Sequence, residues 1–443
     1  MKKHTQSPYE SSKVSYKPSG IKWLGEIPQG WEIKKLKYIG EIFGGVTGKT
    51  IKDFSKEYKL NFKPYITFTN VCNNAVINPD LMEYVFIDSK EKQNKVLKND
   101  ILFLQSSETF EDVGKSAIYL NDDEVYLNTF CKGFRIEREA YPMYLNYLLS
   151  SLSYKRYFMS VCSGFTRINL RQEHFLDIPL ILPPLQEQKE IAEFLDKKCE
   201  KIQNYINKKQ KLITLLQEKK QALINEVVTK GLNPNIELKS GIDYLGLIPH
   251  HWEVKKLKHI CKINPQTNET LPNNFVYIDL ESVAKGQLLK EQTINKEQAP
   301  SRAQRILQKQ DILFQLVRPY QRNNYIFNKN GDYVASTGYA QIRTKECVNF
   351  VYYALLENSF VERVILKSTG SNYPAITSND FADLKIPLPP LQEQEEIAEF
   401  LDSKVAQIDS VIEKTKKQIK LIKEYKNTLI NEAVCGRINL ERK

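Results

Sequence analysis

The chain has 443 residues, 41% of them hydrophobic, which is enough for two or three domains with a sizeable core. Its net charge of +11 suits a polyanionic partner, either nucleic acid or an anionic membrane surface. No stretch approaches the roughly 20 apolar residues of a membrane span, and the basic start leads into no apolar run. Seven cysteines without C-x-x-C spacing argue against a disulfide scaffold or a thiolate zinc site. These features favour a protein of a reducing cytoplasm and exclude a membrane-spanning one.

Four segments of the first half recur in the same order in the second half. They pair 20–28 with 241–249, 31–37 with 252–258, 100–103 with 311–314, and 183–188 with 389–394. The offset between the copies shrinks from 221 to 211 and then to 206 residues, so the stretches between matched segments differ in length. Two domains that share a fold but hold different ligands are expected to differ in this way, because loops tolerate insertions and carry recognition.

Each copy begins with a part predicted to be mixed α/β, at 20–182 and 241–388, preceded in the first copy by an arm at 1–19. Runs rich in β-branched and aromatic residues predict strands at 65–69, 101–104, 276–278 and 312–314. Helical patterns lie near 144–159 and 350–367.

Each copy ends in a long predicted helix, at 183–231 and 389–436, and a tail at 437–443 follows the second. A Pro-Pro pair opens each helix, and Gly231 and Gly436 stand where it is expected to stop. Apolar residues repeat every seven positions, which is typical of a coiled-coil seam. The seam residues are Leu195, Ile202, Ile206, Ile213, Leu216, Leu223, Leu401, Ile408, Ile412, Ile419, Ile422 and Leu429.

Two equal helices in one chain can pair with each other, most simply antiparallel. The expected fold is therefore α/β (α+β), with two similar heads separated by an antiparallel coiled coil in a pseudo-twofold internal repeat. The alternative is that each helix packs separately into the core of its own domain.

Motifs that would carry catalysis are weak or absent. Residues 43–50 resemble a phosphate loop but are one residue short between the glycines. The segments 79–80 and 88–90 faintly resemble the acid pair and the lysine of metal-dependent nucleases, yet the second copy lacks this pattern. A shared metal site is excluded for His250, His251, His259 and Cys261, because the first copy has no matching ligands. No amino-methyltransferase motif is present.

The motifs that are present resemble the specificity subunit of type I restriction enzymes. The start Trp-Leu-Gly-x-Ile-Pro-x-x-Trp-Glu is found at 23–32 and, with Tyr244 in place of Trp, at 244–253. The junction Pro-Pro-Leu-x-Glu-Gln-x-x-Ile-Ala-x-Phe-Leu-Asp is found at 183–196 and 389–402. The resemblance covers nearly the whole chain, and both motifs occur twice in order.

This resemblance implies a function without catalysis. Each head would be a target recognition domain that reads one half of a bipartite, asymmetric double-stranded DNA site. The helices would set the half-site spacing and dock methyltransferase subunits, which use S-adenosylmethionine. Motor-endonuclease subunits, which use ATP and Mg²⁺, would join this core. The chain itself would bind no cofactor or metal.

Base readers are expected among polar, Arg or Lys residues where the copies diverge, since Arg suits guanine and Asn or Gln suits adenine. The candidates are Lys49, Gln105, Thr166, Arg167, Asn169, Arg171, Arg318, Gln321, Arg322, Ser371, Asn372 and Tyr373. Trp31 and Trp252 occupy matched positions in heads that should read different bases, which favours core packing over base stacking. The lysine pairs at 34–35 and 255–256 suit either phosphate contact or a solvated face.

Two other functions remain open at this point. One is a stand-alone nuclease or methyltransferase with two DNA-binding heads, which would need an acid–metal or cofactor motif. The other is a two-headed scaffold that binds a membrane or a protein through its coiled coil, for which DNA affinity would not fall steeply with salt.

Overall fold

The computed structural model describes residues 15–241, 243–267 and 269–438. The chain divides into two compact units: unit 1 is Met1–Lys208 with Lys417–Lys443, and unit 2 is Lys209–Lys416. Each unit therefore contains one head, the start of the long helix that follows this head, and the end of the other long helix. The predicted arm lies mostly outside the described residues, as does most of the predicted tail.

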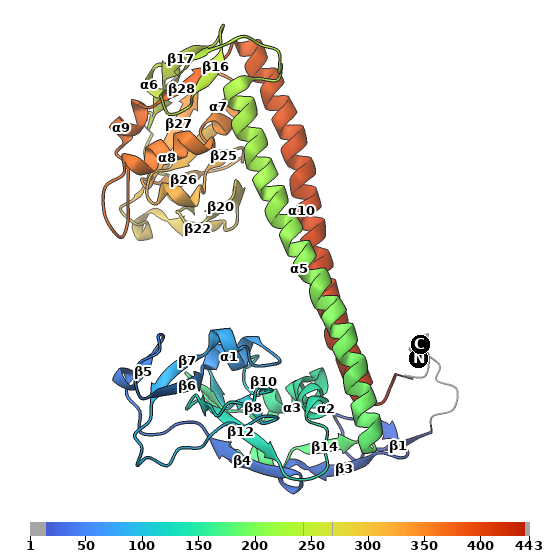
Figure 1. The fold of residues 1–443 in the computed structure, drawn as a ribbon. Helices are drawn as coiled ribbons and strands as arrows, with labels where there is room; N and C mark the ends of the chain where they lie inside the picture. The colour runs from blue at the N-terminus through green and yellow to red at the C-terminus, as the bar shows by residue number, and fades with distance from the viewer. Residues whose placement is uncertain (1–14, 242, 268, 439–443) are drawn as a thin grey trace. The chain divides into compact units, whose positions relative to one another are not determined.

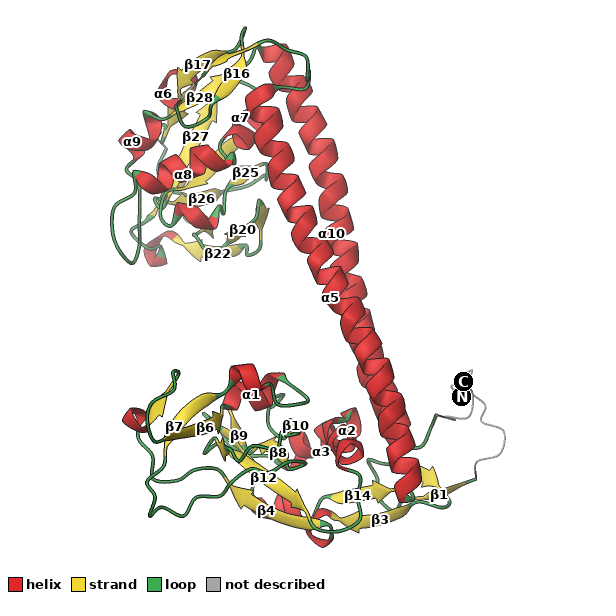
Figure 2. Cartoon of the chain, viewed as in Figure 1, coloured by secondary structure: helices red, strands yellow, loops and turns green. Residues whose placement is uncertain are grey.

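In the described part of residues 20–182, two four-stranded sheets form the first head (Figure 2). Their strands are β4 (Gly40–Gly44), β5 (Phe54–Ser55), β6 (Phe62–Ile66), β7 (Glu83–Phe86), β8 (Ile101–Leu104), β10 (Ser116–Ile118), β11 (Tyr126–Leu127) and β12 (Cys131–Ile136). One sheet is antiparallel with the order β10-β8-β12-β4. The other has the order β11-β6-β7-β5 and pairs β11 parallel to β6.

Short pairings and helices complete unit 1. The pairings join β1 (Tyr16–Pro18) to β2 (Glu26–Pro28), β3 (Glu32–Lys35) to β14 (Pro179–Leu182), and β9 (Ser106–Ser107) to β13 (Ile168–Asn169). The helices are α1 (Phe68–Asn73), α2 (Pro142–Ser150), α3 (Leu152–Val161) and α4 (Gln172–Leu176), with 3-10 turns η1 (Leu36–Tyr38), η2 (Ile51–Asp53) and η3 (Pro79–Leu81).

Unit 2 has the corresponding elements. Its strands are β15 (Leu238–Ser240), β16 (Leu247–Pro249), β17 (Glu253–Lys256), β18 (Cys261–Ile263), β19 (Asn274–Ile278), β20 (Val283–Ala284), β21 (Gln287–Leu288), β22 (Gln292–Asn295), β23 (Ala303–Ile306), β24 (Asp311–Gln315), β25 (Tyr325–Phe327), β26 (Tyr333–Ser336), β27 (Tyr339–Thr344) and β28 (Lys385–Leu388). Its helices are α6 (Leu257–Ile260), α7 (Val348–Ala354), α8 (Asn358–Leu366) and α9 (Ser378–Ala382), with turns η4 (Lys296–Gln298) and η5 (Pro319–Gln321).

The two heads share a framework and differ at their edges. The order β10-β8-β12-β4 of the first head is repeated in the second as β25-β24-β27-β18. The order β11-β6-β7 is repeated as β26-β19-β22. Beyond this shared part, β5 extends the first sheet next to β7, whereas β23 extends the second sheet next to β26. The internal repeat therefore is a repeat of one mixed α/β fold, as the sequence predicts.

Most of the strands and helices predicted from sequence are confirmed, with one error. The run at 65–69 was predicted as a strand, but β6 ends at Ile66 and α1 starts at Phe68. The error arises because Thr67 caps this helix: its side chain accepts a hydrogen bond from the backbone of Asn70. The helical patches predicted at 144–159 and 350–367 are each two helices, broken at Ser151 in the first head and after Ala354 in the second.

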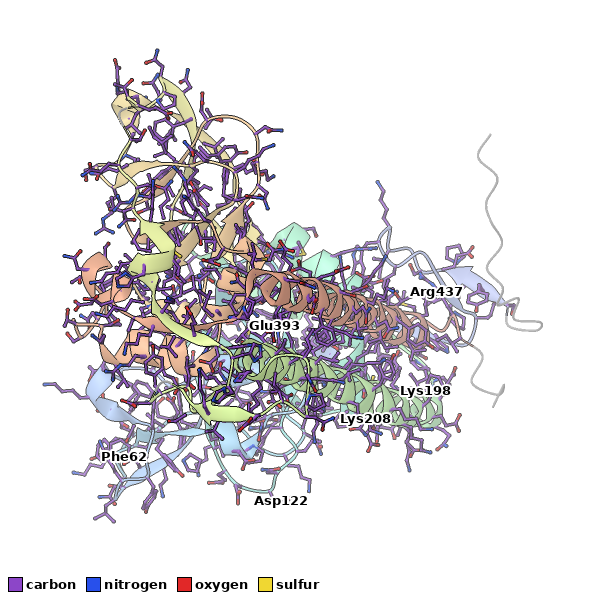
Figure 3. The ribbon with its side chains drawn as sticks, turned by 90° about the horizontal axis from the view of Figure 1, so that it is seen from above. Phe62, Asp122, Lys198, Lys208, Glu393 and Arg437 are labelled. Carbon is purple, nitrogen blue, oxygen red and sulfur yellow. The ribbon has the colours of Figure 1, made fainter. Side chains whose placement is uncertain are left out.

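The long helices are α5 (Leu185–Lys230) and α10 (Leu391–Val434), which run antiparallel beside each other within each unit (Figure 1). Gly231 follows α5 and Gly436 lies just beyond α10, both at positive φ, where a residue without Cβ is favoured. In unit 2, Lys220 of α5 donates to Asp409 of α10 at 2.7 Å. Every predicted seam residue is buried or half-buried, whereas lysines such as Lys198 and Lys208 are exposed (Figure 3).

The repeated Pro-Pro-Leu-x-Glu-Gln motif joins each head to the start of its helix. Gln188 is almost fully buried, accepts a hydrogen bond from the backbone N–H of Tyr141 at 2.9 Å, and donates to the carbonyl of Pro183 at 2.8 Å. Gln394 repeats both contacts in unit 2, with Cys347 and Pro389. This glutamine thus satisfies two backbone groups that the joint removes from water.

The aspartate that ends the motif ties a second point of the head to the helix. The hydroxyl of Tyr147 donates to Asp196 at 2.7 Å, and that of Tyr353 donates to Asp402 at the same distance. Burial raises the pKa of Tyr147 far above its ordinary value, so this hydroxyl stays a donor.

The other long helix also holds each head. In unit 1, Asn431 near the end of α10 accepts hydrogen bonds from the backbone N–H and the hydroxyl of Ser153. In unit 2, Asn225 near the end of α5 accepts from the backbone of Asn358. Ile224, Val227 and Val228 of α5 share one hydrophobic core with Trp252 and other residues of the second head. Each head is thus fixed by both helices.

The joint glutamine predicts a measurable stability effect. Replacing Gln188 by Ala leaves the Tyr141 N–H and the Pro183 carbonyl unpaired, so we expect a loss of about 1–3 kcal/mol in the free energy of unfolding, measured by urea titration. Gln394→Ala should behave alike. The matched control is Gln186→Ala, because Gln186 is exposed and its side-chain amide donates to the exposed Glu190. Equal effects of Gln186→Ala and Gln188→Ala would contradict this role.

Candidate nucleic-acid interface

In the first head, the strand pair β9–β13 brings together most of the predicted base readers. Gln105 lies at the end of β8, and its side-chain amide donates to the carbonyl of Leu170 at 3.1 Å. Asn169 is exposed on β13, and its side chain donates to the carbonyl of Arg167. Thr166 and Arg167 are exposed in the loop before β13, and exposed Arg171 precedes α4. Five of the six candidates in this head therefore belong to one surface.

In the second head, the corresponding surface lies where β24 ends. Arg318 and Arg322 flank the turn η5, both in the left-handed backbone region with φ of 55° and 54°. Gln321 accepts a hydrogen bond from the fully buried Gln315 at 2.8 Å. The loop residues Ser371, Asn372 and Tyr373 are exposed, and Arg318 reaches the ring of Tyr373.

Two predicted readers have side chains that are already engaged. Lys49 forms an ion pair with Glu91, and its side chain is only 3% exposed. The guanidinium of Arg322 donates to the side chain of Asn358 at 2.7 Å. Burial lowers the pKa of Arg322. Base contacts by either residue would first require these interactions to break, so base reading by them remains a prediction that the geometry disfavours.

The matched tryptophans are core residues. Trp31 and Trp252 are 2% and 0% exposed, which confirms packing rather than base stacking. The indole N–H of Trp31 donates to both carboxylate oxygens of Glu187 at 3.2 Å. In unit 2 the equivalent Glu393 contacts His251 at 2.7 Å instead, so this histidine belongs to the joint.

The lysines next to these tryptophans form ion pairs on the surface. Lys35 and Lys37 both contact Asp177, and these contacts hold the pKa of its carboxyl below the usual range. Lys256 and Lys258 repeat the arrangement on Asp383, whose pKa falls to about 2. Lys34 and Lys255 pair with the glutamates two residues before them. These lysines therefore lie on solvated faces with carboxylate partners.

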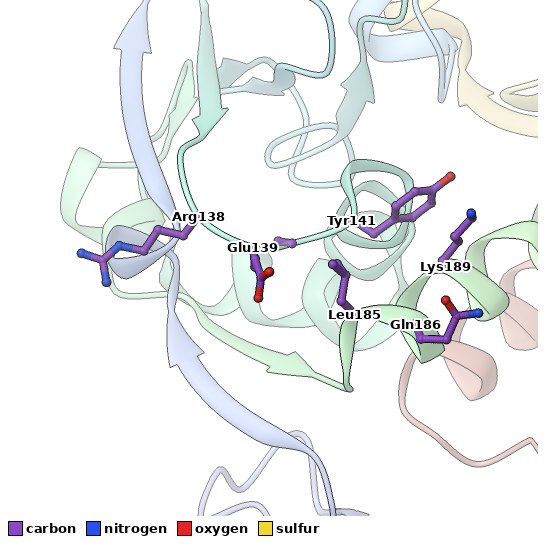
Figure 4. Close-up of a pocket in the computed structure, with 7 residues that line it drawn as sticks. Arg138, Glu139, Tyr141, Leu185, Gln186 and Lys189 are labelled. Carbon is purple, nitrogen blue, oxygen red and sulfur yellow. The ribbon is translucent and has the colours of Figure 1, made fainter.

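The weak catalytic motifs have structural roles. Gly45 of the phosphate-loop-like segment lies against the backbone of Asn128, where a Cβ would come within 2.0 Å of the carbonyl oxygen. Asp88 accepts a hydrogen bond from the backbone of Lys90 and so shapes a turn. A pocket of about 700 Å³ lies at the α5 joint and is lined by Tyr141, Leu185 and Lys189 among others, but by no predicted reader (Figure 4). None of the described helices combines the length and the apolar character that crossing a membrane requires.

Comparison with known proteins identifies the family of this two-headed arrangement. The family model of the type I restriction modification DNA specificity domain matches residues 28–217 and 249–421. The chain belongs to this family. Both matches contain a head and the start of its long helix, so the specificity domain occurs twice in one chain.

Individual relatives agree over nearly the full length. A putative type I restriction enzyme MjaX specificity subunit of Methanocaldococcus jannaschii is 29% identical over 438 residues, covering 94% of this chain and 96% of the relative. The EcoKI specificity subunit of Escherichia coli K12 is 22% identical and covers 94% of this chain and 91% of its own length.

Solved structures agree in fold. A chain from a study of complex assembly and conformational transition of the type I restriction–modification system superposes with a TM-score of 0.70, at 17% identity, over 93% of this chain and 99% of that chain. The HsdS subunit of Thermoanaerobacter tengcongensis gives a TM-score of 0.50, also at 17% identity, over 93% of this chain and 98% of that one.

Sequence reasoning did not find the aromatic partners of the arginines in this interface. Phe130 lies under Arg167, and the residue at its place in the second copy is Gly338, which has no side chain to mark the position. The sequence does carry one signal for these pairs. Tyr373 corresponds to Arg167 at the offset of 206 residues, so an arginine in the first copy is matched by an aromatic residue in the second.

Arg322 provides a test that separates structural from reading roles. We expect Arg322→Ala to lose about 1–3 kcal/mol in the free energy of unfolding, because the carbonyl and amide groups around Asn358 lose a charged donor. The methylated DNA motif of the complex should stay the same. Urea titration and motif mapping measure the two effects, with the exposed Arg302→Ala as the control. A changed base preference in the Arg322→Ala variant would show that Arg322 contacts bases.

Proposed function

We propose that this chain is the non-catalytic DNA-reading subunit of a type I restriction–modification complex. The main support for this proposal is that two heads with the same framework and matched joints present different side chains at the same surface. A matched joint positions each head in the same way, whereas the divergent surface allows each to read different bases. Each head then reads one half of a bipartite, asymmetric site in double-stranded DNA.

The proposal assigns the chemistry to partner subunits. Methyltransferase subunits would use S-adenosylmethionine to modify host DNA, and motor-endonuclease subunits would use ATP and Mg²⁺ to restrict foreign DNA. The engagement of Lys49 by Glu91 and of Asp88 in a turn supports this division, because neither is arranged as a phosphate or metal site. Under this proposal the paired helices also set the spacing between the two half-sites.

The surface of the long helices supports a docking role for them. Leu185 and Leu391 at the helix starts aside, the exposed large hydrophobic residues of α5 and α10 are Tyr205, Leu212, Leu215, Val411, Leu421 and Tyr425. All of these occupy the two heptad positions that flank one side of the seam. In an antiparallel pair these flanks face the same way, so each unit presents an apolar patch formed by both helices.

The two patches correspond through the internal repeat. Tyr205 and Leu421 in unit 1 match Val411 and Leu215 in unit 2, at the same offset of 206 residues. Equivalent patches fit two copies of one partner, and we assign them to two methyltransferase subunits. Exposed apolar area of this kind on an otherwise charged helix pair is costly unless a partner covers it.

A chimeric chain tests the reading function. When residues 241–388 are replaced by residues 20–182, joined at the matched joints, both heads are identical. We expect the methylated motif to change from two different half-sites to two half-sites with the same bases. The measurement is sequencing of methylated positions in a host that expresses the chimera with its methyltransferase partner.

The wild-type chain serves as the control for this experiment. Alone, with S-adenosylmethionine, ATP and Mg²⁺, it should neither methylate nor cleave DNA. Methylation or cleavage by the chain alone would overturn the non-catalytic assignment, and a chimera that keeps the wild-type motif would overturn the assignment of one half-site to each head.

The docking surface is tested by charge insertion. Leu421→Glu and Leu215→Glu place a carboxylate in each patch, and each should weaken methyltransferase binding at least tenfold, with the double variant binding worst. Calorimetry or co-purification measures this binding. The matched controls are Asn427→Glu and Gln217→Glu, which add the same charge at exposed positions on the other side of the seam. Equal weakening by the controls would refute the patches as the docking surface.

A further inference from the structure

Each head contains an arginine that lies close against an aromatic ring at its reading surface. The guanidinium carbon of Arg167 is 4.2 Å from the ring centre of Phe130, and that of Arg318 is 4.1 Å from the ring centre of Tyr373. Other cation–ring pairs are longer, for example that of Arg135 with Phe43 at 5.0 Å and that of Arg363 with Tyr244 at 5.9 Å. These two arginines are therefore in close cation–ring contact, with one such pair in each head.

The two pairs occupy the same place in the fold. In the first head, the backbone of Gln105 donates to Phe130 and accepts from Leu170, both at 2.9 Å. In the second head, Leu316 donates to Gly338 at 2.9 Å and accepts from Ile376 at 3.2 Å. Each junction joins the end of a central strand (β8 or β24), the start of the strand paired with it in the sheet (β12 or β27) and the loop before the last short helix.

In the two heads, the arginine and the aromatic residue of each pair come from different positions of the shared fold. Gly338 takes the place of Phe130, so the second head has no aromatic side chain there. Tyr373 takes the place of Arg167 in the loop and supplies the ring instead, and Arg318 supplies the cation from the strand end. Two different sequences thus arrive at an arginine on an aromatic ring at one position of the fold. A chance packing contact would not be expected to survive such an exchange of parts.

Both arginines have guanidinium N–H donors that are available for a ligand. Neither guanidinium has an ion-pair or hydrogen-bond partner within the described residues, and the Nε of Arg318 is buried without an acceptor. By contrast, Arg135 and Arg343 are bound by the buried carboxylates of Asp100 and Asp311. The φ of 55° at Arg318 is a strained conformation for a residue with a Cβ, which other contacts must hold in place.

We propose that Arg167 and Arg318 are the guanine-reading residues of the two half-sites, with Phe130 and Tyr373 as positioning residues. This inference rests on the proposed function. A guanidinium held against a ring has few rotamers left, and its free edge can donate two parallel hydrogen bonds to O6 and N7 of guanine. The ring remains partly exposed, so it also shields these bonds from water on one side.

The experiment maps the base preference at every position of the methylated motif. We expect Arg167→Gln to reduce the preference for guanine at one position of the first half-site by about 10- to 100-fold, and to leave the second half-site unchanged. Arg318→Gln should do the reverse. Arg318→Lys keeps the charge but loses the two-pronged geometry, so it should lose the preference as well. Arg156→Gln and Arg302→Gln, both exposed, are the controls for loss of charge.

The positioning role has its own readout. Phe130→Tyr and Tyr373→Phe keep a ring and should keep the guanine preference, whereas Phe130→Leu and Tyr373→Leu should reduce it while thermal unfolding stays near wild type. A wild-type chain that directs no split motif would refute the proposed function itself. A split motif in which Arg318→Gln and Arg318→Lys change no base preference, or weaken all positions equally as a phosphate contact would, overturns only the guanine assignment.

Discussion

The structure depends on the pairing of α5 with α10 along their heptad seam. Helices of 46 and 44 residues have too little globular head to cover them, so between the heads each buries its apolar stripe against the other. Two polar side chains along the helix pair also form contacts. Lys220 pairs with Asp409, and the buried hydroxyl of Thr415 donates to the carbonyl of Val411 at 2.7 Å. Because the helices pair antiparallel, each head packs against the start of one long helix and the end of the other.

Antiparallel pairing explains why the chain repeats itself. Each head needs the start of one long helix and the end of another, and only a second copy supplies the second helix. The contacts of Gln188, Asp196 and Asn431 in unit 1 recur with Gln394, Asp402 and Asn225 in unit 2. Because these residues act on backbone groups and on tyrosine hydroxyls of the framework, the reading loops are free to diverge without disturbing the joints.

The sequence predicted the parts that follow from periodicity and repetition, namely two α/β heads, two long helices and the seam. It also predicted buried roles for Trp31 and Trp252 from their matched positions. It failed at residues 67–69, where β-branched and aromatic residues suggested a strand but Thr67 caps a helix. The stacking of Arg167 on Phe130 joins residues 37 positions apart and depends on a loop conformation, which no local pattern encodes. Likewise, the ion pair between Lys49 and Glu91, which disfavours base contact by Lys49, joins residues 42 positions apart.

Chemical crosslinking of the unmodified protein tests the helix pairing most directly. A carbodiimide joins an amine to a carboxylate only when they are in contact, and the Lys220 ammonium lies 2.7 Å from the Asp409 carboxylate. Mass spectrometry of the digested protein should find the peptide containing Lys220 linked to the peptide containing Asp409. If α5 were instead linked only to carboxylates of the two heads, with no link from Lys220 to α10, the antiparallel pair and the account built on it would be wrong.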